Sequence, residues 1–455
     1  MDFELTPEQK DIQKAAREFI QGEYDKEKIL EWEQTHTYPK EIWKKAATLG
    51  FIGIHYPEEY GGQGYGVFEN ILIVEEFCRK DSGVGVALSL ADFSSEVVLR
   101  FGTHEQKKKY LLPVSRGEFI SGGAYTEPDH GSDITLLSTT AIKQGDSFVI
   151  NGTKTFITNG SLADFFVVLC QTDPGAKPPY RGQCTLLVDK GTKGLDATEI
   201  TPKMGIRMTS TAELSFSDVR VPLTHLLGEE SKGFYQVLEF FDESRIEIAA
   251  QALGIAQGAF DRALDYAKQR EQFGKKLVDF QITQHKLADM ATKIEMARLL
   301  TYKAAWNYDQ KRIDPKLTSM AKLFAGRTAV EVADEAIQIL GGYGYITEYE
   351  VERFYRDAKI TEIYEGTKEI QKNTIASALI GKLKGTSPLS PPLAGGDKGE
   401  EERSISITLT PTFSCHRERG NLLVDDEERR DKRGDSRSIG HRRRHCRDAD
   451  GPRHC

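Results

Sequence analysis

Two changes in the spacing of the apolar residues constrain the fold of this chain more than any other feature. Up to about residue 118, apolar side chains such as Ile12, Ala16, Phe19 and Ile20 recur at three- and four-residue intervals, which predicts amphipathic helices. From about residue 119 to 227, short apolar runs bounded by turn residues predict β-strands. Beyond about residue 228 the helical spacing returns and continues to about residue 384. An order of helices, strands and helices predicts an α+β chain.

Start and turn signals divide these regions further. Thr6-Pro7-Glu8-Gln9 is a capping box, so the first helix is expected to begin at Pro7. Phe165–Cys170 is an apolar run that predicts a strand. Ser147–Ile150 followed by Asn151-Gly152 predicts a hairpin turn at the Asn-Gly pair. The predicted domains are an N-terminal helical domain over 1–118, a middle β domain over 119–229 and a C-terminal helical domain over 230–384.

The last 71 residues, 385–455, differ from the rest of the chain. They contain 27 charged residues, nine Leu, Ile or Val residues and one aromatic residue, Phe413. Such a segment cannot bury enough apolar surface to offset the conformational entropy lost on folding. Four of the ten histidines lie here, beside the arginine run 442–444, which leaves a metal- or anion-binding tail as an alternative. We predict that 385–455 is a disordered extension outside the fold.

The overall composition excludes several classes of protein. The 61 basic and 69 acidic residues give a net charge of −8, whereas a nucleic-acid-binding protein needs a basic face for phosphate contacts. No apolar run approaches the roughly 18 residues of a membrane span, and the first residues do not resemble a secretory leader. The six cysteines form no CxxC pair and no zinc-ligand spacing with histidine. These features predict a reduced cytoplasmic protein without a metal site, a nucleic-acid partner or a membrane span.

Four polar, glycine-containing segments are the candidates for chemistry. They span residues 124–133, 154–160, 338–344 and 356–367. The first places hydroxyl groups and backbone donors at a strand end, which suits a phosphate or the polar edge of a flavin. Each segment alone is also typical of an ordinary turn or helix end. No GxGxxG motif follows a strand, so a Rossmann-type dinucleotide site is not predicted.

Together and in this order, these segments resemble the acyl-CoA dehydrogenase family over about residues 1–384. The resemblance implies an N-terminal helical domain, a middle β-barrel-like domain and a C-terminal four-helix bundle. It implies bound FAD, a homotetramer in which a neighbouring subunit completes each flavin site, and an electron-transferring flavoprotein as electron acceptor, as in fatty acid β-oxidation. The motifs that carry it are Pro57–Gly62, Thr126–Pro128, Asn151-Gly152-x-Lys154, Ile157–Gly160, Arg270-x-Gln272-Phe273-Gly274, Gly341-Gly342 and Ile363–Thr367.

Glu365 stands at the position of the family's catalytic base. The α-hydrogen of a thioester is a weak acid, so the base needs an elevated pKa and the carbonyl must be polarised. A carboxylate against apolar surface has its pKa raised by the loss of hydration. The resemblance implies that Glu365 takes the α-proton while the β-hydrogen leaves as hydride to flavin N5, which gives a 2-enoyl-CoA. The backbone N–H of Glu365 and a flavin ribityl hydroxyl would polarise the thioester carbonyl.

The resemblance also implies roles for residues around the base. Phe156 stands where many members have tryptophan, and Arg245 is the expected anchor of CoA. The expected cofactor-binding residues are Tyr125, Thr126, Gly131, Ser132, Phe156, Ile157, Thr158, Arg270, Gln272, Phe273, Phe280, Gln281, Gln338, Gly341, Gly342 and Thr367. The expected substrate-binding residues are Ser132, Asp242, Arg245, Tyr364, Gly366 and Asp92.

Several alternatives stay open. Some members carry the base directly before the arginine that corresponds to Arg245, and Ser244 at that position favours Glu365 instead. Asp92 lies where most members have small or apolar residues. It could cap a helix or face outward, or it could face an alicyclic acyl group, such as cyclohexane- or cyclohexene-carboxyl-CoA, as a second base. An acyl-CoA oxidase, an enoyl-CoA reductase and a non-enzymatic flavoprotein are alternatives on the same fold, and the acyl chain length is not indicated.

Overall fold

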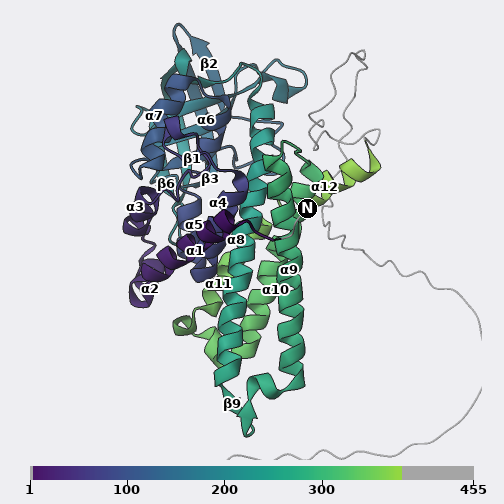
Figure 1. The fold of residues 1–455 in the computed structure, drawn as a ribbon. Helices are drawn as coiled ribbons and strands as arrows, with labels where there is room; N and C mark the ends of the chain where they lie inside the picture. Colours follow the sequence, from purple (N-terminus) through teal and green to yellow (C-terminus); the bar gives the residue numbers. More distant parts are fainter. Residues whose placement is uncertain (1–3, 382–455) are drawn as a thin grey trace, which may run out of the picture. The chain divides into compact units, whose positions relative to one another are not determined.

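The computed structural model describes residues 4–381. Helices, a sheet and a second set of helices follow one another along the chain, as the apolar spacing predicts (Figure 1). Residues 1–3 and 382–455, including the predicted extension, lie outside the described residues. Within 4–381, no helix is long and apolar enough to cross a membrane.

In the N-terminal region α1 and α5 pack against α4, which is buried along most of its length. The first helix begins at the predicted capping box, where the Thr6 side chain accepts a hydrogen bond from the Gln9 N–H and the Gln9 side chain accepts one from the Thr6 N–H. The helices of this region are α1 (Pro7–Gly22), α2 (Lys26–Thr35), α3 (Lys40–Thr48), α4 (Val67–Lys80), α5 (Ser82–Ser89), α6 (Ser95–Phe101) and α7 (His104–Ser115).

The middle of the chain forms an eight-stranded sheet in the order β6-β7-β3-β2-β4-β5-β8, with β1 paired to β4. The pairs β1–β4 and β2–β4 are parallel and the other pairs are antiparallel. Every residue of β4 is buried. The strands are β1 (Ser121–Ala124), β2 (Thr140–Gln144), β3 (Ser147–Thr158), β4 (Phe165–Gln171), β5 (Gln183–Asp189), β6 (Leu195–Glu199), β7 (Thr211–Pro222) and β8 (Leu226–Leu227).

The hairpin turn predicted at Asn151-Gly152 is wrong. β3 continues through this pair, and its register against β7 shifts between Ile150 and Gly152, which makes the pair a β-bulge. The turn before β3 lies instead between Gln144 and Ser147, the last paired residues of β2 and β3. Asn-Gly favours positive φ in both a tight turn and a bulge, so the dipeptide alone does not separate the two.

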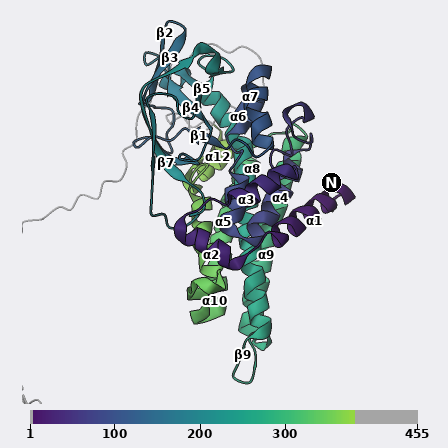
Figure 2. The ribbon, with the colours of Figure 1, turned by 90° about the vertical axis from the view of Figure 1, so that its left-hand side faces the viewer.

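Long helices make up the C-terminal region. α8 begins against β5, packs on α4 and runs beside α9 and α10. The short β9–β10 hairpin joins α8 to α9 at the end that is remote from the sheet (Figure 1 and Figure 2). The elements are α8 (Gly233–Gln269), β9 (Glu271–Gln272), β10 (Lys275–Lys276), α9 (Gln281–Asp309), α10 (Pro315–Leu340), α11 (Val351–Ala358), the 3₁₀ turn η7 (Lys359–Glu362) and α12 (Lys368–Ile380).

Candidate active site

Glu365 lies in a short segment between η7 and α12. Glu365 and Gly366 both have left-handed backbone conformations, with φ of 51° and 90°. The left-handed conformation costs a residue with a side chain roughly 1–2 kcal/mol, so the surrounding contacts must hold Glu365 in place. Glycine suits the conformation at Gly366, and a Cβ atom there would lie 2.6 Å from Nε2 of Gln371 and displace that side chain.

The surroundings of the Glu365 carboxyl group suit a base. Burial raises its pKa, and the hydrogen bond from Ser244 and the positive charges of Lys322 and Arg245 oppose this rise. The hydroxyl of Ser244 donates to Oε2 of Glu365 at 2.6 Å. A carboxylate with an elevated pKa takes a proton from a weak carbon acid more readily than an exposed carboxylate does.

One pocket, which we call the Glu365 pocket, brings many of the predicted residues together. The turn after β1 supplies one wall, and α8 supplies another through residues spaced three and four apart on one helix face. Seven predicted site residues line it: Tyr125, Thr126, Gly131, Ser132, Arg245, Glu365 and Gly366. The apolar part of its lining comes from Ile134, Phe234, Leu238, Phe241 and Ile370.

Arg245 brings a buried guanidinium group to the lining of this pocket. Its side chain is 4% exposed, and Nη1 donates to Oδ1 of Asp242 at 3.1 Å. Nε of Arg245 is buried and has no hydrogen-bond partner within residues 4–381. This N–H is therefore available to an acceptor on a ligand that enters the pocket.

A second group of predicted residues lies at the other end of α8, in what we call the Gly341 cleft. Arg245 and Arg270 are 25 positions apart on and just beyond α8, which corresponds to about 37 Å at 1.5 Å per residue. Phe273, at the tip of the β9–β10 hairpin, is 95% exposed. Four predicted residues line the cleft: Arg270, Gln272, Gly341 and Gly342. The rest of the lining comes from residues that were not predicted: Tyr266, Leu277, Ile339, Leu340, Tyr343 and Ile346.

The remaining predicted residues do not line either pocket. Phe156 and Thr158 lie on β3, where Phe156 is 66% exposed, and Ile157 between them is buried. Thr367 caps α12 by accepting from the Ile370 N–H, and Tyr364 donates to Oε1 of Gln251. Phe280 and Gln281 lie at the start of α9, Gln338 lies in the last turn of α10, and Asp242 is paired with Arg245.

Asp92 faces inward, not outward as one alternative supposed. It lies between α5 and α6, and its Oδ2 accepts hydrogen bonds from the Gly53 N–H at 3.0 Å and the Tyr56 hydroxyl at 3.4 Å. Burial raises the pKa of Asp92 to about 6, and the charge of nearby His55 opposes the rise. These bonds show that Asp92 anchors the turn before η1 (Glu58–Tyr60).

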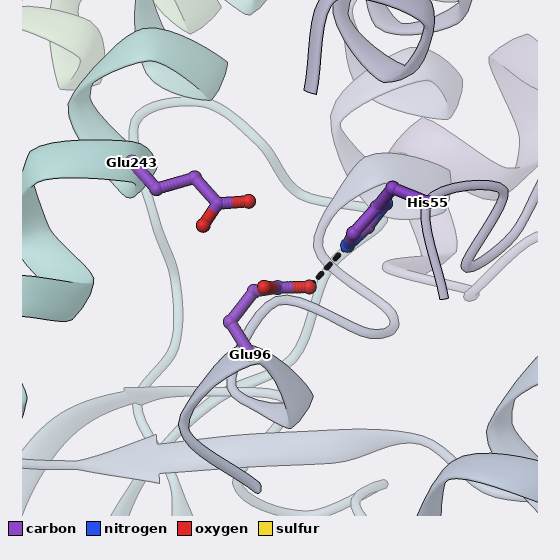
Figure 3. Close-up of side chains that lie close together, drawn as sticks. All are labelled: His55, Glu96 and Glu243. Carbon is purple, nitrogen blue, oxygen red and sulfur yellow. Dashed lines mark hydrogen bonds and ion pairs between the residues drawn. The ribbon is translucent and has the colours of Figure 1, made fainter. Parts of the chain in front are cut away.

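Beside Asp92, three side chains approach one another from different elements. His55 pairs with Glu96, and Glu243 of α8 points toward them (Figure 3). Arg100 also pairs with Glu243, and Tyr308 donates to Glu243 at 3.1 Å. The acidic groups of this cluster therefore already have protein partners.

The sequence analysis did not identify the residues that hydrogen-bond to the backbone of the Glu365 segment. Lys322 of α10 and Gln371 of α12 donate to backbone carbonyl oxygens of the Glu365 segment. A lysine at an otherwise apolar helix position was the available signal for Lys322. Ser244 was considered as a position for the base, but not as a hydrogen-bond donor to Glu365.

Sequence models of three domains match almost all of the described chain. They are the N-terminal domain of acyl-CoA dehydrogenase over residues 6–118, the middle domain over 122–219 and the C-terminal domain over 231–380.

Individual relatives point to the same family as the domain models. The short-chain-specific acyl-CoA dehydrogenase of Clostridium acetobutylicum is 44% identical over 380 residues, which cover 83% of this chain and all of the relative. CarC, a subunit of the caffeyl-CoA reductase-Etf complex of Acetobacterium woodii, is 41% identical over 379 residues, which cover 83% of this chain and all of the relative. The structure of butyryl-CoA dehydrogenase from Megasphaera elsdenii superposes with a TM-score of 0.80 at 41% identity, and covers 84% of this chain and all of that one. The motifs, the fold and these matches together establish that the chain belongs to the acyl-CoA dehydrogenase family.

Proposed function

We propose that Glu365 is the base that removes the α-proton of the acyl-CoA substrate in this FAD-dependent acyl-CoA dehydrogenase. The observation that carries the proposal is the position of its carboxyl group, which is half-buried in the Glu365 pocket, hydrogen-bonded to Ser244 and raised in pKa. Bound FAD would supply the acceptor for the β-hydride. The residues present fit such ligands, because Nε of Arg245 is a buried donor that has no partner among residues 4–381, and the pocket wall offers the hydroxyls of Thr126 and Ser132.

The backbone of the base also contributes to the proposed step. Within residues 4–381, the N–H of Glu365 donates no hydrogen bond. A free donor next to the base can stabilise the negative charge that develops on the thioester oxygen as the proton leaves. The paired Asp242 and Arg245 would hold the CoA portion. The apolar faces of Phe241 and Leu238 exclude water, which strengthens the interactions of the base.

We propose a short-chain acyl-CoA as the substrate and an electron-transferring flavoprotein as the electron acceptor. The short-chain-specific relative and the butyryl-CoA dehydrogenase support the first, and the caffeyl-CoA reductase-Etf complex supports the second. The same relative, CarC, supports the alternative of an enoyl-CoA reductase on this fold. A cytoplasmic location is consistent with three buried cysteines that are free thiols, Cys78, Cys170 and Cys184.

We propose that the protein works as a homotetramer. The Gly341 cleft is about 37 Å along α8 from the Glu365 pocket, too far for the two to hold one FAD molecule within a single chain. The Gly341 cleft would therefore bind the cofactor of a neighbouring copy. The exposed Phe273 on the adjacent hairpin supports a contact there, because Tyr343 and Ile346 of the cleft lining are also exposed and grouped apolar side chains are typical of an interface.

Anaerobic titration of the holoenzyme with acyl-CoA esters tests the proposed function. The series would run from butyryl-CoA to palmitoyl-CoA and include glutaryl- and cyclohexanecarboxyl-CoA, with flavin absorbance as the readout. Butyryl-CoA is expected to bleach the flavin, and Glu365→Gln is expected to keep FAD and slow the bleaching by at least ~10²–10⁴-fold. Bleaching of Glu365→Gln at the wild-type rate would contradict the assignment of the base.

A further inference from the structure

The backbone of the Glu365 segment accepts a hydrogen bond from a lysine to which the proposed mechanism gives no role. Lys322 lies on α10, is 1% exposed, and donates from Nζ to the carbonyl oxygen of Gly366 at 2.6 Å. One turn later, Gly326 lets α10 approach η7 so closely that a Cβ atom would lie 2.9 Å from the carbonyl oxygen of Thr361. α10 therefore packs directly against the segment that carries Glu365.

Gln371 provides a second support from α12. It is fully buried, and its Nε2 donates to the carbonyl oxygens of Glu365 at 3.0 Å and of Gly366 at 2.9 Å. Lys322 and Gln371 together fix two consecutive peptide groups. Because peptide groups are planar, fixed carbonyl oxygens fix the backbone from which the Glu365 side chain projects. These contacts explain how two adjacent left-handed residues persist.

Charged groups from four elements surround the ammonium group of Lys322. Glu365, Glu362 of η7 and Glu369 of α12 stabilise its positive charge, and Arg245 of α8 opposes it. Burial outweighs the carboxylates and lowers the pKa of Lys322 to about 7. The positive charge in turn opposes the burial that raises the pKa of Glu365. The base and the lysine beneath it are thus coupled electrostatically.

We propose that Lys322 is a positioning residue for the base, and that its protonated side chain, with Gln371, holds the Glu365–Gly366 backbone in the conformation that proton abstraction requires. The inference rests on the proposed function of Glu365. The ammonium group donates a charge-assisted hydrogen bond, which is stronger than the bond from a neutral amine. Flavin reduction is therefore fastest when Glu365 is without its proton and Lys322 is protonated, so the rate falls on both the acid and the alkaline side of an optimum.

The test measures the limiting rate of flavin reduction by butyryl-CoA in the holoenzyme, by stopped flow, from pH 5.5 to pH 9.5. Lys322→Met keeps the unbranched shape of the side chain but removes its charge and its hydrogen bond. We expect it to retain FAD, to lose the alkaline limb of the profile, and to reduce flavin about 10–100-fold more slowly at the wild-type optimum, since small misplacements of reacting groups cost up to about 10²-fold. Lys303→Met, at an exposed position of α9, is the control for loss of one charge.

Gln371→Leu separates positioning from charge. It removes two hydrogen bonds to the same carbonyl oxygens and leaves Lys322 in place, so it is expected to slow flavin reduction and keep the alkaline limb. A wild-type rate and pH profile in Lys322→Met would overturn the proposal. If Lys322→Met does not fold, either of two results would overturn the proposal. One is flavin reduction by Gln371→Leu at the wild-type rate, and the other is a pH profile of the wild-type protein that has no alkaline limb. Failure of the proposed function itself would show separately, as normal bleaching of Glu365→Gln.

Discussion

The hydrogen bond from Ser244 to Glu365 allows a quantitative prediction. The donor and acceptor oxygens are 2.6 Å apart, and the bond favours the ionised carboxylate. Hydrogen bonds to charged groups contribute about 1.5–3 kcal/mol, and one pKa unit corresponds to about 1.4 kcal/mol. Ser244→Ala should therefore raise the pKa of Glu365 by about 1–2 units. The base acts without its proton, so the acid limb of the reduction profile should move to higher pH by the same amount.

The assay is stopped-flow reduction of the FAD-bound variant by butyryl-CoA across a pH series. About 10–100-fold slower reduction is expected on the acid limb, while the alkaline limb should keep its wild-type position. Ser319→Ala is the matched control, because Ser319 is also fully buried but its hydroxyl has no partner within residues 4–381. An acid limb that stays within about 0.3 pH units of the wild-type position would refute the argument that Ser244 sets the pKa of the base.

Two further predictions concern residues away from the base. Asp92 is half-buried with a pKa of about 6, above its ordinary value of about 3.9, so its ionisation destabilises the fold as the pH rises through that interval. Asp92→Asn should raise the free energy of unfolding at pH 7.5 by up to ~3 kcal/mol and leave the turnover of straight-chain substrates unchanged; a selective loss with cyclohexanecarboxyl-CoA would instead assign it a catalytic role. Phe273→Asp should weaken the tetramer and release FAD, seen by analytical ultracentrifugation and flavin fluorescence, and a stable tetramer with full FAD would contradict the interface.

The sequence predicted the order of domains and the elements that carry the Glu365 pocket, because those depend on local periodicity and on motifs. It did not predict the hydrogen bonds from Lys322 and Gln371 to the backbone at Glu365 and Gly366. The bond from Lys322 to the Gly366 carbonyl joins positions 44 residues apart, and the acceptor is a backbone atom that every residue type has. No pattern of side chains marks which carbonyl a buried lysine will reach. The Asn151-Gly152 error has a similar origin, since the strand pairing that distinguishes a bulge from a turn is not local.

The length of α8 would link catalysis to assembly in the proposed homotetramer. Its first half carries Ser244 to the Glu365 carboxyl group and Arg245 into the Glu365 pocket, and its far end leads into Arg270 and the Gly341 cleft. An α-helix rises about 1.5 Å per residue, so neither site can move toward the other without breaking the helix. If each FAD bridges two copies, binding of the cofactor and association of subunits are one linked equilibrium, and each stabilises the other by mass action. Dilution of the protein should then release FAD and lower the activity per subunit, whereas added FAD should restore both.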